Sequence, residues 1–266
     1  MKRIALAVGI VAVLAVAGGG AVWWLHHRPA PSRGISAVKA RHLPAASPIP
    51  PPQALEAMYG NGGSAGSLAL QDGRVASVWA QRTFRIGGIE RVAVLVAVEA
   101  EGGDCHACPA LLGASVYRKA AGRWVLESKA NEIGKTGSFG NAGSPEGLEA
   151  RPIGPGKAVL LVPDSDTSQG ITKAGVHLFV YAPPRWTDAG FVDLSGNNSG
   201  QCSDDPQERQ RERLDPCWKV TGKLTLVPGR NKEFYDIRVT RKGNSPEPSA
   251  RDETLVFDGK AYREKR

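Results

Sequence analysis

Short apolar runs, separated by turns that contain glycine or proline, dominate the chain from about residue 68 onward. The clearest example is the stretch 91–127, which reads as strand, cysteine-bearing loop, strand, tight turn and strand. Its first run, Val92–Val98, is apolar on both faces and rich in β-branched side chains, which favours a buried strand over a helix. The segment Lys119–Gly122, between two apolar runs, is typical of a hairpin turn.

The same order of features recurs twice downstream. In each unit a glycine that closes one apolar run is followed within four residues by the start of a strand, and aromatic residues follow in the next two strands. The three strands open at Arg91, Lys157 and Glu233. This pattern predicts an all-β domain of antiparallel meanders, arranged as a sandwich or in a propeller-like manner, with a threefold internal repeat as one interpretation. The alternative is three unrelated meanders whose features align by chance.

The first 28 residues carry the strongest hydrophobic signal. Met1–Arg3 is followed by an uncharged run, Ile4–Leu25, which as a helix spans roughly 33 Å, enough to cross a bilayer core. Two tryptophans stand near its end, where indole rings favour the lipid–water boundary. We therefore expect residues 1–28 to form a single-pass anchor in a bacterial inner membrane. The competing interpretation is a cleaved signal peptide, with Ala15–Ala17 as its small-residue cleavage site.

Two signals for membrane topology disagree. Two basic side chains precede the hydrophobic run and four follow it closely, a distribution that by itself would hold the C-terminal domain in the cytoplasm. Four cysteines, an even number behind an export signal, favour the oxidising side of the membrane. We give the cysteines more weight and expect the C-terminal domain to lie in the periplasm.

Composition divides the rest of the chain into a linker and one folded domain. Residues 29–52 contain seven prolines and no hydrophobic period, as expected of an extended, semi-rigid spacer. Residues 53–266 form the predicted all-β extracytoplasmic domain, which opens with one or two helical turns at Gln53–Tyr59.

The net charge of +8 is unevenly distributed. Six of the 34 basic side chains, and none of the 26 acidic ones, precede residue 53, so the folded domain carries 28 basic against 26 acidic residues. A nearly neutral domain lacks the electrostatic footprint of a nucleic-acid-binding protein. We therefore expect no nucleic acid among its partners.

Cys202 and Cys217 bracket a charged segment without an apolar period. A bridge between them would close a loop of about 16 residues and stabilise the fold by about 3 kcal/mol in the chain-entropy account. We expect this structural disulfide. Pairings that join one of these two cysteines to one of the other two are the alternative.

The other two cysteines form the motif Cys105-His106-Ala107-Cys108. Oxidoreductases use this cysteine spacing where a helix N-terminus lowers the pKa of one thiol, and a histidine between the cysteines would strengthen that effect. The residues that follow suit a strand better than a helix, and the β-α-β pattern of a thioredoxin-like fold is missing. We expect a structural Cys105–Cys108 disulfide, with a redox site as the alternative. The motif is half of a zinc site, and no second half with ligand spacing follows.

Oxygen-bearing side chains follow the strand predicted at Lys157. Asp164, Asp166 and Ser168 place oxygens at alternate positions, as in a calcium-binding loop, but the glycine falls one place late and no glutamate closes the loop. We expect a polar turn here, with a calcium site as the alternative, and no cofactor. His177 lies inside an apolar run with no readable nucleophile partner, and is expected to be a half-buried strand histidine.

The tether, the spacer and the lack of a readable catalytic constellation together favour a non-catalytic protein. We expect a membrane-tethered periplasmic binding or interaction module of the cell envelope, held in the inner membrane through residues 4–25. Its expected partner is an envelope protein or the cell wall. The alternative function is a periplasmic thiol-disulfide oxidoreductase that uses Cys105, His106 and Cys108.

Overall fold

The computed structural model describes residues 48–100, 108–229, 233–245 and 251–265, all within one compact unit, 40–266. Strands dominate this part of the chain, which confirms the prediction of an all-β domain with antiparallel sheets. In the described ranges no helix is long and apolar enough to cross a membrane. The run Ile4–Leu25, expected to form the anchor, lies outside them, as does most of the linker 29–52.

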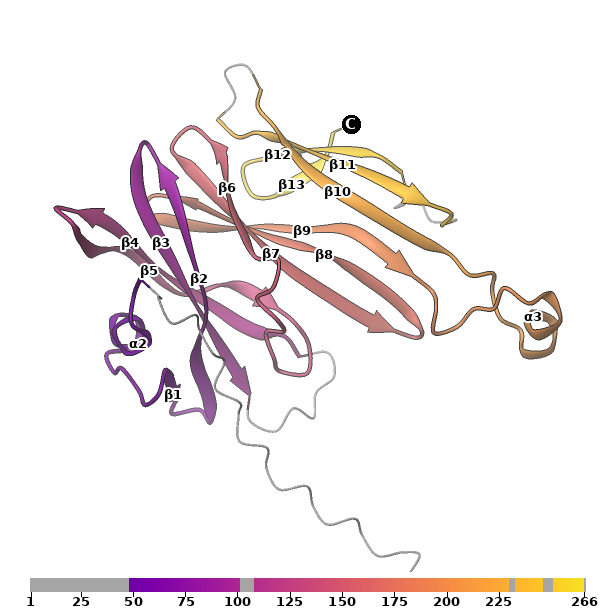
Figure 1. The fold of residues 1–266 in the computed structure, drawn as a ribbon, viewed down its shortest axis with the longest axis horizontal. Helices are drawn as coiled ribbons and strands as arrows, with labels where there is room; N and C mark the ends of the chain where they lie inside the picture. Colours follow the sequence, from indigo (N-terminus) through magenta and orange to yellow (C-terminus); the bar gives the residue numbers. More distant parts are fainter. Residues whose placement is uncertain (1–47, 101–107, 230–232, 246–250, 266) are drawn as a thin grey trace, which may run out of the picture. The chain divides into compact units, whose positions relative to one another are not determined.

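Consecutive strands pair with one another within each of two sheets, as expected for meanders (Figure 1). A five-stranded sheet follows chain order and consists of β1 (Ser67–Ala69), β2 (Arg74–Ile86), β3 (Ile89–Ala100), β4 (Ala110–Ala120) and β5 (Arg123–Thr136). An eight-stranded sheet follows chain order as well and consists of β6 (Glu149–Gly154), β7 (Lys157–Ser168), β8 (Ile171–Ala182), β9 (Arg185–Asn197), β10 (Lys219–Val227), β11 (Asp236–Gly243), β12 (Glu253–Phe257) and β13 (Tyr262–Glu264).

The larger sheet is narrow at its middle. β9 and β10 share only two register pairs, Lys219 with Asn197 and Val220 with Gly196, whereas β7 and β8 pair along their whole length. The short helix α3 (Pro206–Glu212) lies in the excursion between β9 and β10 (Figure 1). Apart from the short β1, the strands therefore divide into three runs of four, which we call the first meander (β2–β5), the second meander (β6–β9) and the third meander (β10–β13).

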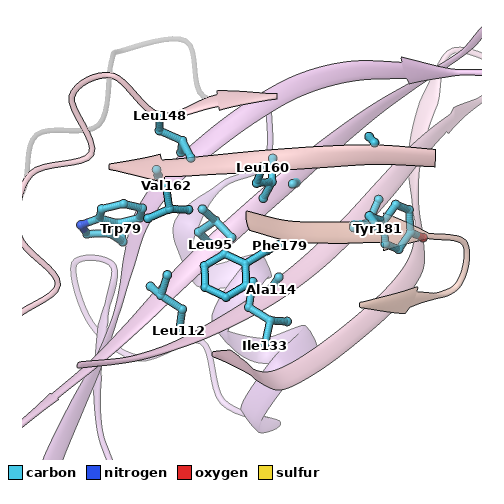
Figure 2. Close-up of a cluster of buried hydrophobic side chains, with 14 of the residues drawn as sticks. Trp79, Leu95, Leu112, Ala114, Ile133, Leu148, Leu160, Val162, Phe179 and Tyr181 are labelled. Atoms are coloured by element: carbon cyan, nitrogen blue, oxygen red, sulfur yellow. The ribbon is translucent and has the colours of Figure 1, made fainter. Parts of the chain in front are cut away.

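The main hydrophobic core lies between the first and second meanders. Phe179 of β8 is fully buried in it, and Figure 2 shows its ring among side chains of the first meander. The rings of Phe84 and Tyr181 meet edge to face across the same interface, 6.2 Å between centroids. Full burial of a side chain such as Phe179 stabilises the fold by about 2–3 kcal/mol. This core is formed chiefly by Trp79, Leu95, Leu112, Ala114, Ile133, Leu160, Val162, Phe179 and Tyr181.

A second core lies on the opposite face of the second meander. Successive side chains of a strand point to opposite faces, so Leu160 contributes to the first core and Val159 to the second. Ile237 and Val239 of β11 cover this face from the third meander. Both faces of β7 are thus buried along its first half, which explains why the run after Lys157 is apolar without alternation.

Helix α2 (Pro51–Tyr59) covers the outer face of the first meander, where Leu55 and Met58 pack with the valines of β3. Proline at the first helical position fits because its missing N–H needs no partner there. Gly60, with φ of 75°, ends the helix in a left-handed cap. The helical turns expected at Gln53–Tyr59 are confirmed, and the helix starts two residues earlier.

Candidate functional site

A cleft of about 430 Å³ lies where the β7–β8 hairpin extends past the end of β6. One wall is the hairpin together with β9, and the other is the start of the connection between β5 and β6, residues 137–148. A second hollow of about 570 Å³ adjoins it around Gly137, Ser138, Asp164 and Ser165. The first cleft is lined by Gly137, Ser138, Phe139, Asp164, Ser165, Asp166, Thr167, Ser168, Lys173, His177 and Phe191.

The connection that forms this wall is anchored to the first meander. The buried indole of Trp79 donates from Nε1 to the carbonyl of Gly143 at 3.1 Å. The guanidinium of Arg82 donates from Nε to the carbonyl of Leu148 at 2.8 Å, and Glu99 accepts from the backbone N–H of Ala142 at 3.0 Å. This segment, which is rich in glycine and serine, is therefore held in place over most of its length.

Phe139 occupies the tip of a tight turn in that wall. Phe139 and Gly140 have φ of 53° and 73°, and the N–H of Asn141 donates to the carbonyl of Ser138 at 2.9 Å. Positive φ at both central residues is the pattern of a type I′ turn, which favours Asn-Gly or Gly-Gly because bulky side chains are unfavourable in the left-handed region. Phe139 nevertheless stands there, with 44% of its surface exposed. The turn presents an aromatic ring at a cost in backbone energy.

Asp164 and His177 join the two walls. The carboxylate of Asp164 accepts from Nε2 of His177 at 2.9 Å and from the N–H of Gly137 at 3.1 Å through Oδ2, and from the N–H of Ser165 at 2.8 Å through Oδ1. Burial raises the pKa of this carboxyl, but the hydrogen bonds from His177, Gly137 and Ser165 outweigh it and hold the pKa below its usual value. Asp164 is therefore ionised at neutral pH, and Nε2 of His177 carries the donated proton.

Phe191 lies opposite, beside His177. The two residues are register partners on β9 and β8, and their ring centroids are 5.0 Å apart. Irregularities in the β8–β9 register occur on both sides of this pair, as is common where a strand re-aims a side chain near a site. A Cβ on Gly175 would come within 2.0 Å of the carbonyl oxygen of Val192 and within 2.7 Å of the Phe191 ring, so glycine is needed for both to lie there. Phe191 keeps 45% of its surface exposed.

The polar row Asp164, Asp166 and Ser168 belongs to β7, and the expected polar turn at this position is wrong. Pairing with β8 as far as Ser168 extends the strand through it, so alternate residues share one face. No group of three or more histidine, cysteine, aspartate or glutamate side chains suited to a metal gathers in the part of the chain that is described. Because Asp164 already accepts three hydrogen bonds, it is poorly placed to ligate calcium, and the calcium alternative stays an untested hypothesis.

Of the cysteine motif, only Cys108 is among the described residues. It is disulfide-bonded, and β4 begins two residues later at Ala110, so a strand follows the motif as expected. Cys105 and His106 lie outside the described residues, so the Cys105–Cys108 pairing and the redox alternative remain predictions. The carbonyl of Cys108 accepts from the N–H of Gly140 at 2.6 Å, which brings the second cysteine of the motif beside the Phe139 turn.

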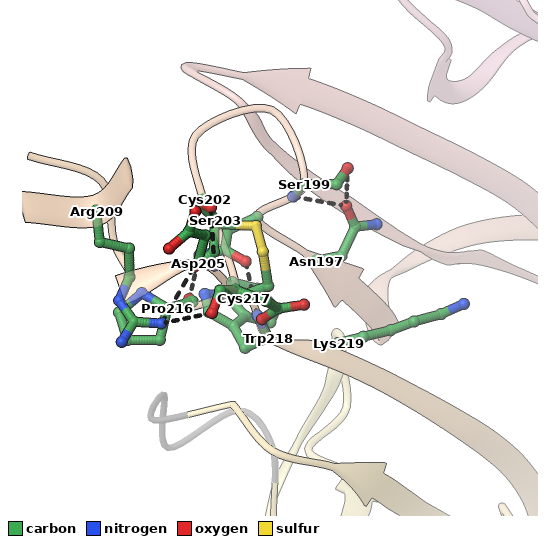
Figure 3. The surroundings of a disulfide bond; sticks show 12 residues. Asn197, Ser199, Cys202, Ser203, Asp205, Arg209, Pro216, Cys217, Trp218 and Lys219 are labelled. Carbon is green, nitrogen blue, oxygen red and sulfur yellow. Dashed lines mark hydrogen bonds between the residues drawn. A yellow bond between two sulfur atoms is a disulfide. The ribbon is translucent and has the colours of Figure 1, made fainter. Parts of the chain in front are cut away.

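The bridge between Cys202 and Cys217 is present, with an S–S distance of 2.07 Å (Figure 3). It closes the excursion that carries α3, a helix with no buried side chain. Asn198 supports the base of this excursion: its side chain accepts from the N–H of Trp218 at 2.8 Å and donates to the carbonyl of Pro216 at 3.0 Å. The predicted pairing is confirmed, and the bridge closes a loop whose base is joined to the β7–β8 turn by a hydrogen bond from the N–H of Gly200 to the carbonyl of Gly170 at 3.0 Å.

The comparisons with protein families, with curated proteins and with solved structures found no match to this chain. The site must therefore be interpreted from its own geometry. The sequence interpretation missed Phe139 and Phe191. The segment Ser138-Phe139-Gly140-Asn141 did carry a usable signal, because a phenylalanine stands before glycine in a turn-forming context.

Proposed function

We propose that this protein is a non-catalytic binding module of a bacterial cell envelope and that the cleft beside Asp164 and His177 is its ligand site. One observation carries the proposal. Of the five large hydrophobic side chains that are exposed in the described ranges, two are aromatic, Phe139 and Phe191, and both line this cleft. Exposed aromatic rings beside convergent polar groups in a concave site are characteristic of ligand binding.

The backbone at Phe139 supports the same conclusion. A left-handed conformation at a bulky residue costs about 1 kcal/mol or more and persists where surrounding contacts enforce it. Burial offsets this cost only in part, because 44% of the surface of Phe139 stays exposed. A ligand that covers the exposed part of the ring would offset more of it.

The His177–Asp164 pair contributes rigidity rather than reactivity in this proposal. Within the described residues, no serine, threonine or cysteine side chain is hydrogen-bonded to His177. The pair instead fixes the hairpin to the Gly137 backbone. A cleft whose two walls are joined in this way is pre-organised, which reduces the ordering cost of binding.

Photo-crosslinking in living cells tests the proposal for a ligand of any chemistry. The full chain would carry benzoylphenylalanine in place of Phe139 or Phe191, and matched control chains would carry it in place of Val125 or Leu126. The control residues are also exposed hydrophobic residues, at 43% and 40%, but they lie on β5 outside the cleft. We expect adducts from the two cleft positions and none from the controls. Equal labelling at all four positions, or none at any, would refute the proposed site.

We further propose that the domain is tethered to the inner membrane through residues 4–25 and lies in the periplasm. The uncharged run Ile4–Leu25 and the disulfide between Cys202 and Cys217 support this location. A β-lactamase fused after Arg266 should protect cells from ampicillin. Activity of a cytoplasmic reporter at the same point would contradict the location, and recovery of residues 1–17 on the membrane-bound product would show that the anchor is not cleaved.

We also propose that the three meanders are repeats of one propeller-like unit. Each has four antiparallel strands in chain order, and the repeated sequence pattern covers the last three strands of each. Arg91, Lys157 and Glu233 all lie within three residues of the first residue of the second strand of their meanders. The second meander, buried on both faces, is covered by the other two.

A further inference from the structure

The charges around the cleft argue against a polyanionic ligand. Its lining carries two carboxylates, Asp164 and Asp166, one ammonium on Lys173, and His177. Asp164 is hydrogen-bonded to His177, and Asp166 stands opposite Lys173 as its register partner. Two carboxylates and a single ammonium form no basic patch, so a polyanion would find no net positive field here.

The two aromatic rings define the shape of the ligand. The face of a phenylalanine ring is electronegative and attracts the weakly positive hydrogens of a C–H surface. Phe191 lies over Gly175 and beside His177, and the left-handed turn places Phe139 on the opposite wall. Aromatic rings at the two walls fit a flat ligand that has an apolar C–H face and polar edges.

Polar side chains continue along the hairpin from this point. Asp164, Asp166 and Ser168 occupy one face of β7 at intervals of about 6.6–6.8 Å, twice the rise per residue of a strand. Ser138 and Ser165 also line the cleft. Acceptors and hydroxyls in such a row fit a ligand that offers hydroxyl groups at regular intervals along an extended chain.

We infer that the cleft binds a neutral polysaccharide strand, with a pyranose ring stacked on Phe139 or Phe191 and its hydroxyls hydrogen-bonded along β7. A pyranose combines a C–H face with hydroxyl edges and carries no charge, so it meets all three requirements. This inference rests on the proposed function, since it assigns a ligand class to the same cleft. In a cell envelope such a strand is available as cell-wall glycan.

Titration calorimetry on the full chain tests the ligand class. The protein is kept in a zwitterionic detergent, because glycoside detergents would compete for the site. The probes are the uncharged oligosaccharides chitohexaose, cellohexaose and xylohexaose. Benzyltrimethylammonium and a neutral Ser/Ala hexapeptide represent the two rival ligand classes, a cation stacked on the rings and a peptide added to the β7 edge.

Three variants test whether glycan binding depends on the two aromatic rings of the cleft. Phe139→Asn removes the ring but suits the left-handed turn, so we expect glycan affinity to fall tenfold or more while Tm stays level or rises by about 2 °C. Phe191→Ala should weaken binding by a similar factor. Leu126→Ala, an exposed residue outside the cleft, should change neither affinity nor ligand preference.

Each remaining outcome counts against the inference in a different way. Failure of all three glycans to bind, or tighter Phe139-dependent binding of the ammonium or the peptide, would overturn the ligand class while leaving the cleft as the ligand site. Glycan binding that Phe139→Asn and Phe191→Ala leave unchanged would place the glycan elsewhere. A clear fall in Tm for Phe139→Asn would mean that the ring serves the fold. Absence of cleft-specific photo-crosslinks would refute the binding site itself.

Discussion

A single carboxylate determines how the walls of the cleft meet. Asp164 lies on β7, and its three donors come from the connection after β5, from β8 and from its own strand. At most 17% of its side chain is exposed, so these bonds are partly shielded from water. Hydrogen bonds to a charged group are worth about 1.5–3 kcal/mol each, roughly twice the contribution of neutral ones. The geometry of the site therefore depends on the ionisation of Asp164.

Because of that dependence, we expect the free energy of unfolding to fall at acidic pH. The folded-state pKa of Asp164 lies below its usual 3.8, so its contribution is fully present above about pH 5 and is lost as pH falls through the folded value. Asp164→Asn should lower the free energy of unfolding at pH 7 by about 1–3 kcal/mol and flatten its decline below pH 4. Urea unfolding at pH 7, 4 and 3 measures both effects. Asp166→Asn, exposed two residues further on, should behave as the unmodified protein. Parallel acid declines for Asp164→Asn and the unmodified protein would contradict the prediction.

For single residues, the sequence predicted burial and disulfide pairing better than it predicted side-chain contacts. His177 is half-buried on a strand as expected, and Cys202 pairs with Cys217. Neither the partner of His177 nor the exposure of Phe191 could be predicted, because both depend on register across β7, β8 and β9. Phe139 depends on backbone dihedrals that no hydrophobic period records.

Among the elements, β7 is the strand whose full length the hydrophobic pattern failed to predict. Its first half is apolar and was predicted as a strand, but Asp164–Ser168 is wholly polar and offers neither alternation nor a run of apolar residues. The strand continues because β8 supplies a paired partner at every position as far as Ile171. Tertiary pairing decides the conformation of such a segment. The polar half that patterning missed is the half that lines the cleft.

In the excursion that carries α3, we expect the disulfide to provide the stability that a hydrophobic core provides elsewhere in the domain. None of its helical side chains is buried, so apolar burial does not hold it. Cys202→Ser with Cys217→Ser should therefore lower the free energy of unfolding by about 3 kcal/mol, the loop-closure value for a separation of 15 residues. Urea unfolding measures it, with Arg211→Ala, an exposed change on α3, as the control. A midpoint equal to that of the control would show that the bridge adds no stability.

For the whole molecule, the sequence pattern identified the strands but not how the sheets face one another. The predicted units correspond to the last three strands of each meander, and their aromatic residues, such as Tyr117 and Tyr181, do lie on those strands. Which face meets which neighbour is decided by side chains far apart in the chain. Arg91 is the clearest case. The sequence predicted only that a strand begins there, whereas in the structure its side chain is buried, with 6% of the residue exposed.

Arg91 is the centre of a polar cluster that joins the first meander to the second. Its guanidinium contacts both carboxylate oxygens of Glu127, Nε to Oε2 at 2.7 Å and Nη2 to Oε1 at 3.0 Å, and Nη1 donates to the carbonyl of Ile86 at 3.0 Å. Tyr181 of β8 donates to the same carboxylate at 3.0 Å. Burial raises the pKa of Glu127, but the bonds from Arg91 and Tyr181 lower it by more, so Glu127 is ionised at neutral pH.

Breaking this cluster on one side should cost more than removing the ion pair altogether. Glu127→Leu leaves the Arg91 charge buried without its partner, so we expect the free energy of unfolding to fall by about 3–5 kcal/mol. Arg91→Met combined with Glu127→Leu removes both charges, and should recover most of that loss. Urea unfolding at pH 7 of both single variants and the double variant completes the cycle. The exposed pair Lys119–Glu90 is the matched control, and Glu90→Gln should change stability by less than about 1 kcal/mol. Additive losses in the double variant would show that Arg91 and Glu127 act independently, and that apolar packing alone sets the interface between the two meanders.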